Sequence, residues 1–318
     1  MDSESFRKLL PVVDGFPKPD WEGIYTLLDP LPENDPDGVW VEFARTWVNV
    51  MAECVGPTYT VSETDEFLIL SSMESKKLKL FETFVEETRR SVLRKLSDIA
   101  EDEGEGKHVL FLFADTDTYD RYISHTYPSL EEEPDFDRFL DDWVLTPDDD
   151  IQGFQPRAFS TGYFCNEPYG HIAFSHADLS GTQAVFTREL TKAFLRQSPM
   201  PLWLKLALAQ TLENEVCNSS PLHMDVSSIA NHQQFWDADT IQEFWSGESF
   251  HRPDAGGELS YELGRYCLQA LSHDLDEFKA FANEASFEDG GEAAALKVFG
   301  GSLGGLPFQF FGEGDWSP

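Results

Sequence analysis

The stretch that decides the fold reads QAVFTRELTKAFLRQ at residues 183–197 and, after the break SPMP, PLWLKLALAQTLENEV at residues 201–216. In the first segment, apolar side chains recur at helical spacing on one face, at Phe186, Leu190, Ala193 and Phe194. The second segment has almost no polar side, which is typical of a helix buried all round. We therefore expect an amphipathic, charged helix followed directly by a core helix.

The segments around this pair predict a sheet before it and another helix after it. Strand-like runs bounded by turn residues occur at 58–62, 66–72, 108–115, 161–165 and 171–175. Helical periodicity predicts helices from Trp40 onward, over 75–100, around Tyr119, Tyr122 and Ile123, and over 260–282. Residues 1–38 are rich in Pro, Asp and Gly and the tail from residue 299 is rich in Gly, so both are expected to be irregular.

The chain is strongly acidic. Its 318 residues include 23 Lys plus Arg and 58 Asp plus Glu, for a formal net charge of −35. Nucleic acids and anionic membranes are bound by clustered cations, so binding to either is not expected. Hydrophobic residues make up 41% of the chain, which is enough for a packed core. The sequence shows no secretory signal pattern, no apolar run of about 20 residues and no metal-binding cysteine spacing, so we expect a cytoplasmic protein.

The expected helix over 75–100 is unusually basic for this chain. It carries Lys76, Lys77, Lys79, Arg89, Arg90, Arg94 and Lys95. Two explanations are open: a docking face for an acidic partner, or a solvated face whose cations pair with the protein's own carboxylates. The second arrangement is the commoner one, and we expect it here.

The order of elements around residues 183–216 resembles the peptidase MA-like branch of the gluzincin zinc metallopeptidases. In that family a strand pair precedes a helix with the motif HExxH, a Pro-rich break leads to a helix reading WLxEGLA, and the next helix opens with a Tyr. Here the strand pair is TGYFC and HIAFS, the first helix contains RELTKA at 188–193, and the second contains WLKLALAQ at 203–210. The similarity covers roughly residues 57–316.

The resemblance implies a gluzincin-like α+β fold, in which a small mixed or antiparallel sheet with a long helix is followed by a mainly helical C-terminal half. We accordingly expect residues 1–56 to form an N-terminal lead-in and helix. Residues 57–316 would form the peptidase MA-like domain, with a sheet-containing half at 57–180 and a helical half at 181–316.

The resemblance also implies that the zinc site has been lost. The two helical His ligands of the family correspond to Arg188 and Lys192, and its third ligand, a Glu, corresponds to Leu206. Zinc binds neutral imidazole or carboxylate groups, so these three residues cannot hold it and no metal cofactor is expected. Glu189 remains at the position of the family's general base, and Tyr261 falls near its oxyanion-binding position. Without a metal to polarise water, Glu189 is not expected to support peptide hydrolysis.

The charged residues of this helix have two interpretations. Arg188 and Lys192 stand one turn apart and Glu189 lies three residues before Lys192, so two cations could neutralise a buried carboxylate. The helix would then line a polar cleft that binds a peptidic or small anionic ligand. Alternatively, Arg188, Lys192 and Arg196 form a solvated basic stripe with no buried site. The resemblance favours the cleft.

Other candidate sites are weaker. His171 and His176 are five residues apart, so on a strand they point to opposite faces and do not bind a metal together. The acidic segment 131–150 lacks the calcium-loop pattern and is expected to be solvated. Four further histidines lie in separate segments and are expected at the surface or at helix caps: His223, His232, His251 and His273.

Together these patterns predict a catalytically inactive, metal-free metallopeptidase-like protein whose cleft binds a peptidic or anionic ligand. Two alternatives stay open. One is an active hydrolase whose metal is held by non-standard ligands, such as carboxylates from 131–150. The other is an acidic protein-interaction or nucleic-acid-mimic protein, which requires carboxylates arrayed along one surface.

Overall fold

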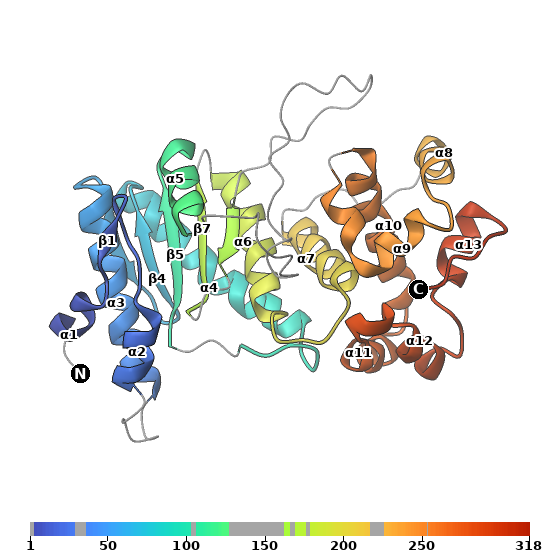
Figure 1. Ribbon diagram of the computed structural model, residues 1–318, viewed down its shortest axis with the longest axis horizontal. Coiled ribbons are helices and arrows are strands. Elements are labelled where there is room, and N and C mark those ends of the chain that lie inside the picture. The colour runs from blue at the N-terminus through green and yellow to red at the C-terminus, as the bar shows by residue number, and fades with distance from the viewer. Residues whose placement is uncertain are drawn as a thin grey trace. The chain divides into compact units, whose positions relative to one another are not determined.

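The protein is a mixed α+β molecule (Figure 1). The computed structural model describes residues 3–28, 36–102, 106–126, 162–165, 169–175, 179–216, 226–252 and 254–318. These residues fall into two compact units. Among the described residues, the first unit contains the chain up to Ala193 apart from residues 92–101, and the second contains residues 92–101 and the chain from Phe194 onward.

A five-stranded sheet organises the first unit. Its order is β3 (Thr60–Glu63), β4 (Phe67–Ser71), β5 (His108–Phe113), β7 (His171–Ser175) and β6 (Gly162–Cys165). The three central strands are parallel, with Leu70 opposite Phe111 and Phe111 opposite Ala173, and each edge strand runs antiparallel to its neighbour. β4 and β7 are buried at every position, which explains why they read as continuous apolar runs and not as alternating patterns.

The N-terminal elements cover one face of this sheet. They are α1 (Ser3–Lys8), the hairpin β1 (Val12–Val13) and β2 (Phe16–Pro17), α2 (Trp21–Leu28) and α3 (Pro36–Val55). α3 packs on β3 and β4, and its Phe43 and Trp47 join Leu68, Leu70 and Phe111 in one buried cluster. α5 (Thr116–Thr126) contacts β5 and β7.

Two helices cover the other face. α4 (Ser75–Lys95) and α6 (Leu179–Phe194) bring Phe81 and Phe186 together with ring centroids 6.2 Å apart. Phe186 also packs edge-on against Phe67 of β4, and Phe81 against Phe174 of β7. The sheet is therefore enclosed on both sides, with α3 and α6 on opposite faces (Figure 1).

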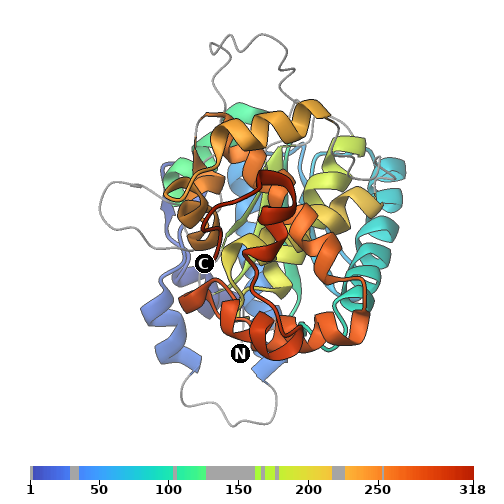
Figure 2. The same cartoon turned by 90° about the vertical axis from the view of Figure 1, so that its right-hand side faces the viewer.

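The second unit is helical, and its helices are drawn in yellow to red (Figure 2). They are α7 (Leu202–Val216), α8 (Val226–Phe235), α9 (Thr240–Ser246), α10 (Ala255–Leu271), α11 (Leu275–Glu284), α12 (Glu292–Val298) and α13 (Gly305–Phe311), with short 3-10 turns η2 (Glu248–His251) and η3 (Phe287–Asp289). α7 packs against α10, where Gly264 allows close approach to Ala207. The expectation that α7 is a core helix is confirmed, since most of its apolar side chains are buried.

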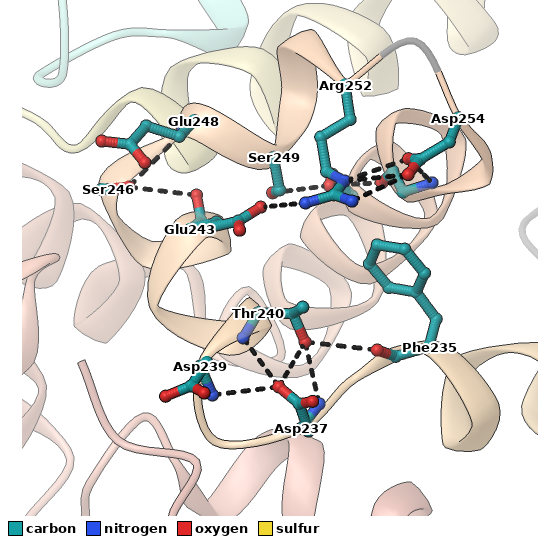
Figure 3. A network of polar contacts seen from close by, with 12 residues as sticks. Phe235, Asp237, Asp239, Thr240, Glu243, Ser246, Glu248, Ser249, Arg252 and Asp254 are labelled. Atoms are coloured by element: carbon teal, nitrogen blue, oxygen red, sulfur yellow. Dashed lines mark hydrogen bonds and ion pairs between the residues drawn. The ribbon is translucent and has the colours of Figure 1, made fainter.

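Arg252 joins three helices of the second unit (Figure 3). Its guanidinium donates to both carboxylate oxygens of Asp254 and, at 2.7 Å, to Glu243 of α9. The same guanidinium lies 5.3 Å from the ring centre of Phe235 at the end of α8. Asp254 also accepts a hydrogen bond from the Gly256 amide and so caps the start of α10. The cluster fixes the start of α10 against α8 and α9.

Three sequence expectations about secondary structure were wrong. Residues 1–38 are not irregular, because Phe6, Phe16 and Ile24 are buried anchors and Asp14–Gly15 forms a hairpin turn with positive φ at both residues. The helix expected over 260–282 is two helices, since Asp274 accepts hydrogen bonds from two amides and starts α11 anew. The tail from residue 299 contains α13. The remaining strands and helices that fall on described residues are confirmed within a few residues.

Candidate functional site

The charged cluster on α6 is centred on a carboxylate that water does not reach. Glu189 is fully buried, whereas the side chains of Arg188 and Lys192 are 21% and 9% exposed. The apolar face of the same helix, with Phe186 and Leu190, is buried as the sequence periodicity predicts. Glu189 therefore lies in the interior of the protein, with two largely covered cations beside it.

Both cations contact the Glu189 carboxylate. Arg188 Nε donates to Oε1 at 2.8 Å. Lys192 Nζ donates to Oε2 at 3.1 Å and to Oε1 at 3.3 Å. The spacing of three residues between Glu189 and Lys192 puts the two side chains on neighbouring positions of one helical turn. Each carboxylate oxygen of Glu189 thus accepts at least one charge-assisted hydrogen bond.

Electrostatics keep Glu189 ionised. Burial alone would raise the pKa of the Glu189 carboxyl, because a buried charge loses its hydration. The charges of Lys192 and Arg188 and their hydrogen bonds outweigh this effect and hold the pKa of Glu189 below its usual value. At neutral pH the Glu189 carboxylate is therefore an anion between two cations.

The remaining buried polar side chains of α6 are satisfied within the helix. Thr187 donates to the Gln183 carbonyl at 2.9 Å, and Thr191 donates to the Thr187 carbonyl at 2.7 Å. Such bonds to the carbonyl one turn earlier leave the hydroxyl groups without a role in holding Glu189. Charge compensation of Glu189 within the described residues thus comes from Arg188 and Lys192.

This geometry bears on the two interpretations of the helix. In a solvated basic stripe, Arg188 and Lys192 would extend into bulk water, whereas both point to Glu189 and are largely covered. The stripe interpretation therefore does not describe these two residues. The binding of a ligand beside them stays a prediction.

The residues present do not fit a zinc ion. Guanidinium and ammonium groups have no lone pair for a metal, and both oxygens of Glu189 already accept hydrogen bonds from cations. Within the described ranges, no group of three or more His, Cys, Asp and Glu side chains is placed to hold a metal ion. The segment 131–150, from which non-standard ligands were considered, lies outside the described residues.

Leu206 and Tyr261 belong to the second unit. Leu206 is a buried core residue of α7. Tyr261 lies on α10, half-buried, with its ring edge-on to Phe250 at a centroid distance of 5.1 Å. The structure thus brings Arg188, Glu189 and Lys192 together in the first unit and places Leu206 and Tyr261 on packed helices of the second.

Sequence reasoning missed a buried polar pair in the first unit. His171 of β7 is almost fully buried, and its Nε2 lies 2.5 Å from the Tyr122 hydroxyl of α5. Burial lowers the pKa of His171 to about 3, so the ring is neutral. Its Nδ1 faces the Tyr169 carbonyl at 3.3 Å, which assigns the ring proton to Nδ1 and makes Nε2 the acceptor. The sequence signal for this buried pair was a His inside an otherwise apolar strand.

His232 was expected at the surface or at a cap, and that expectation was wrong. It is fully buried in α8, where Nδ1 accepts from Trp236 Nε1 at 2.9 Å and Nε2 lies 3.2 Å from a carboxylate oxygen of Glu262. Its ring stacks on Phe311 of α13. These contacts fasten α8 to α10 and α13 and leave neither ring nitrogen open to a metal. His176 and His223 lie outside the described residues.

Comparisons with known proteins give no relative: no family model, no curated protein and no solved structure matches the chain. The gluzincin-like assignment therefore rests on the order of elements and the residues quoted above. Among the described helices, none is long and apolar enough to cross a membrane.

Proposed function

We propose that this chain is a catalytically inactive, metallopeptidase-like protein in which two fixed cations replace the charge of the zinc ion. In this proposal α6 corresponds to the metal-binding helix of the peptidase MA-like branch. The observation that carries it is the buried Glu189 carboxylate held between Arg188 and Lys192. A carboxylate buried so completely is costly unless positive charge stands beside it, and zinc would supply that charge in an active enzyme.

The fold supports the proposal in outline. A mixed sheet with an antiparallel strand at its edge precedes the charged helix, and a core helix follows directly in the sequence. The backing helix α4 and the C-terminal helices occur in the expected order.

Peptide hydrolysis does not follow from this cluster. A general base must accept a proton, and a lowered pKa together with two bound cations makes Glu189 a poor acceptor. The cluster also offers no Lewis acid from its own residues to polarise a carbonyl or a water molecule.

Binding is the function that the cluster supports best. The cluster brings two largely covered cations together in a chain whose total charge is −35. We therefore propose a small anionic or peptidic ligand, whose carboxylate would be attracted to Arg188 and Lys192.

Elemental analysis tests the proposal. Protein purified without added metal is analysed for zinc, manganese, iron and nickel, and the same sample is tested for cleavage of a casein substrate beside an active zinc peptidase. We expect metal far below one ion per chain and no cleavage. Stoichiometric metal, or cleavage abolished by Glu189→Gln, would overturn the proposal.

Thermal-shift screening with acidic metabolites and short acidic peptides tests the ligand class separately. We expect at least one compound to stabilise the wild-type protein and to lose this effect in Arg188→Gln. The matched control Arg90→Gln removes an exposed arginine of α4 and should leave the effect unchanged. If no compound stabilised the protein, the proposed ligand class would be wrong. The proposal of an inactive scaffold would then be tested by the elemental analysis alone.

A further inference from the structure

Within the described residues, two of the seven basic residues of α4 form ion pairs with the protein's own carboxylates. Arg89 pairs with Asp102 at 2.5 Å and with Glu66 at 3.4 Å, and Lys95 pairs with Glu215. For these two residues, pairing with the protein's own carboxylates is confirmed. At the amino end of the helix, Lys76, Lys77 and Lys79 are exposed, and within the described part of the chain their side chains make no ion pair. Pairing with the protein's own carboxylates therefore does not account for these three lysines.

The position of these lysines is electrostatically unfavourable. The first turn of α4 contains no acidic residue, and positive side chains there oppose the positive end of the helix dipole. Lys76 and Lys79 are also three residues apart on one helix face, where like charges repel. Glu74 directly precedes the helix, but within the described residues neither it nor another carboxylate forms an ion pair with the three lysines. Three exposed lysines without an ion pair at the positive end of a helix break a local rule, and we take this as a mark of a functional surface.

An exposed apolar side chain accompanies the lysines. Leu80 is 62% exposed and lies four residues after Lys76, on the same face. Its neighbours Leu78 and Phe81 lie on other sides of the helix and are buried. We call Lys76, Lys77, Lys79 and Leu80 the α4 lysine patch.

We propose that the α4 lysine patch docks a short acidic peptide segment of a partner protein. Carboxylates of the segment would pair with the lysines, and one of its apolar side chains would cover Leu80. The charge of the whole chain repels extended polyanions, but at physiological salt exposed charges act over only about 8 Å. A segment with few carboxylates can therefore be held by the patch, whereas most of a nucleic acid or an anionic membrane would face the acidic surface.

Fluorescence anisotropy tests the proposal with a labelled peptide of repeating Glu-Glu-Leu sequence at physiological salt. We expect saturable binding to the wild-type protein and a loss of about tenfold or more in affinity for Lys76→Glu/Lys79→Glu. The control Lys8→Glu/Lys18→Glu makes the same change in net charge at other exposed positions and should retain the wild-type affinity. Leu80→Ser should weaken binding, and a peptide with Gln in place of Glu should not bind.

Thermal unfolding adds a readout that does not depend on the peptide. Because the lysines oppose the helix dipole, Lys76→Glu/Lys79→Glu should raise the melting temperature of the free protein. Lack of saturable binding, equal weakening in the control, or tighter patch-dependent binding to phosphatidylserine vesicles or single-stranded DNA would overturn the proposal. A lower melting temperature would show that the lysines stabilise the fold, and would also contradict it.

Discussion

Lys192 holds its ammonium nitrogen 3.1 Å from Oε2 of Glu189, three residues earlier on the same helix, in a part of the protein where Glu189 has no contact with water. This contact is local in sequence, yet its strength depends on the surroundings. On an exposed helix such a pair contributes only a few tenths of a kcal/mol, whereas removing one partner of a buried pair leaves a charge without compensation.

Replacement of Lys192 by Met should therefore destabilise the protein strongly. Breaking a buried ion pair costs about 3–5 kcal/mol, and because Arg188 remains beside Glu189 we expect a loss of about 3 kcal/mol. Urea unfolding followed by tryptophan fluorescence measures the change. The control Lys77→Met removes an exposed lysine and should change the free energy of unfolding by less than about 0.5 kcal/mol. Equal small effects for both variants would contradict the buried pairing.

Glu189 should also make stability depend on acid pH. Its pKa in the folded protein lies below the ordinary value of 4.5, so the ionised carboxylate stabilises the folded state above pH 4.5. This contribution is lost as the pH falls through the lower, folded-state pKa. Glu189→Gln should therefore be less stable than wild type at neutral pH, with a difference that shrinks in acid. A difference that stays constant down to the acid transition would contradict the ion pairing.

Removal of the Tyr122 hydroxyl should destabilise the protein, because His171 loses its hydrogen-bond donor. Tyr122→Phe leaves Nε2 of a buried, neutral imidazole without its donor, which costs about 1–3 kcal/mol. Chemical denaturation measures this loss. Tyr266→Phe removes a hydroxyl with only a long 3.4 Å contact to Gln309 and serves as the matched control. Similar stabilities for Tyr122→Phe and wild type would show that the hydrogen bond is dispensable.

The Asp274 side chain caps the start of α11 and should stabilise the folded protein. Its carboxylate accepts hydrogen bonds from the amides of Asp276 and Glu277, so Asp274→Ala should lower the free energy of unfolding by about 1 kcal/mol. Asp276→Ala alters a neighbouring exposed carboxylate that does not cap the helix and should have the smaller effect. A larger loss in Asp276→Ala would argue against the cap.

Elements with a strong periodic signal could be predicted from the sequence. The apolar run HVLFLF gave β5, and the spacing of Phe186 and Leu190 gave α6, because burial of one face imposes that spacing. The pairing of Glu189 with Lys192 could also be predicted, since residues three apart are neighbours on the surface of a helix. Their burial could not, because it depends on which distant segments cover the helix.

Contacts between distant residues escaped prediction. Tyr122 and His171 are 49 residues apart and meet only because α5 packs beside β7. The Asp14–Gly15 turn and the Asp274 cap have local sequence signals. The Pro-rich segment around the first and the continuous helical pattern around the second predicted other structures. The Arg252 cluster likewise joins residues from three helices whose packing no local pattern specifies.

Restoring the ligands tests the central proposal most directly. Calorimetric zinc titration is carried out on Arg188→His/Lys192→His, which restores the family's two helical histidines beside Glu189 on α6. The control Thr83→His/Glu87→His places two histidines at the same spacing on the exposed face of α4. If α6 is a metal-binding helix whose ligands have been replaced, the α6 double variant binds one zinc ion per chain at least about tenfold more tightly than this control, and wild type binds none. Zinc affinity no higher in the α6 double variant than in the control would contradict the proposal.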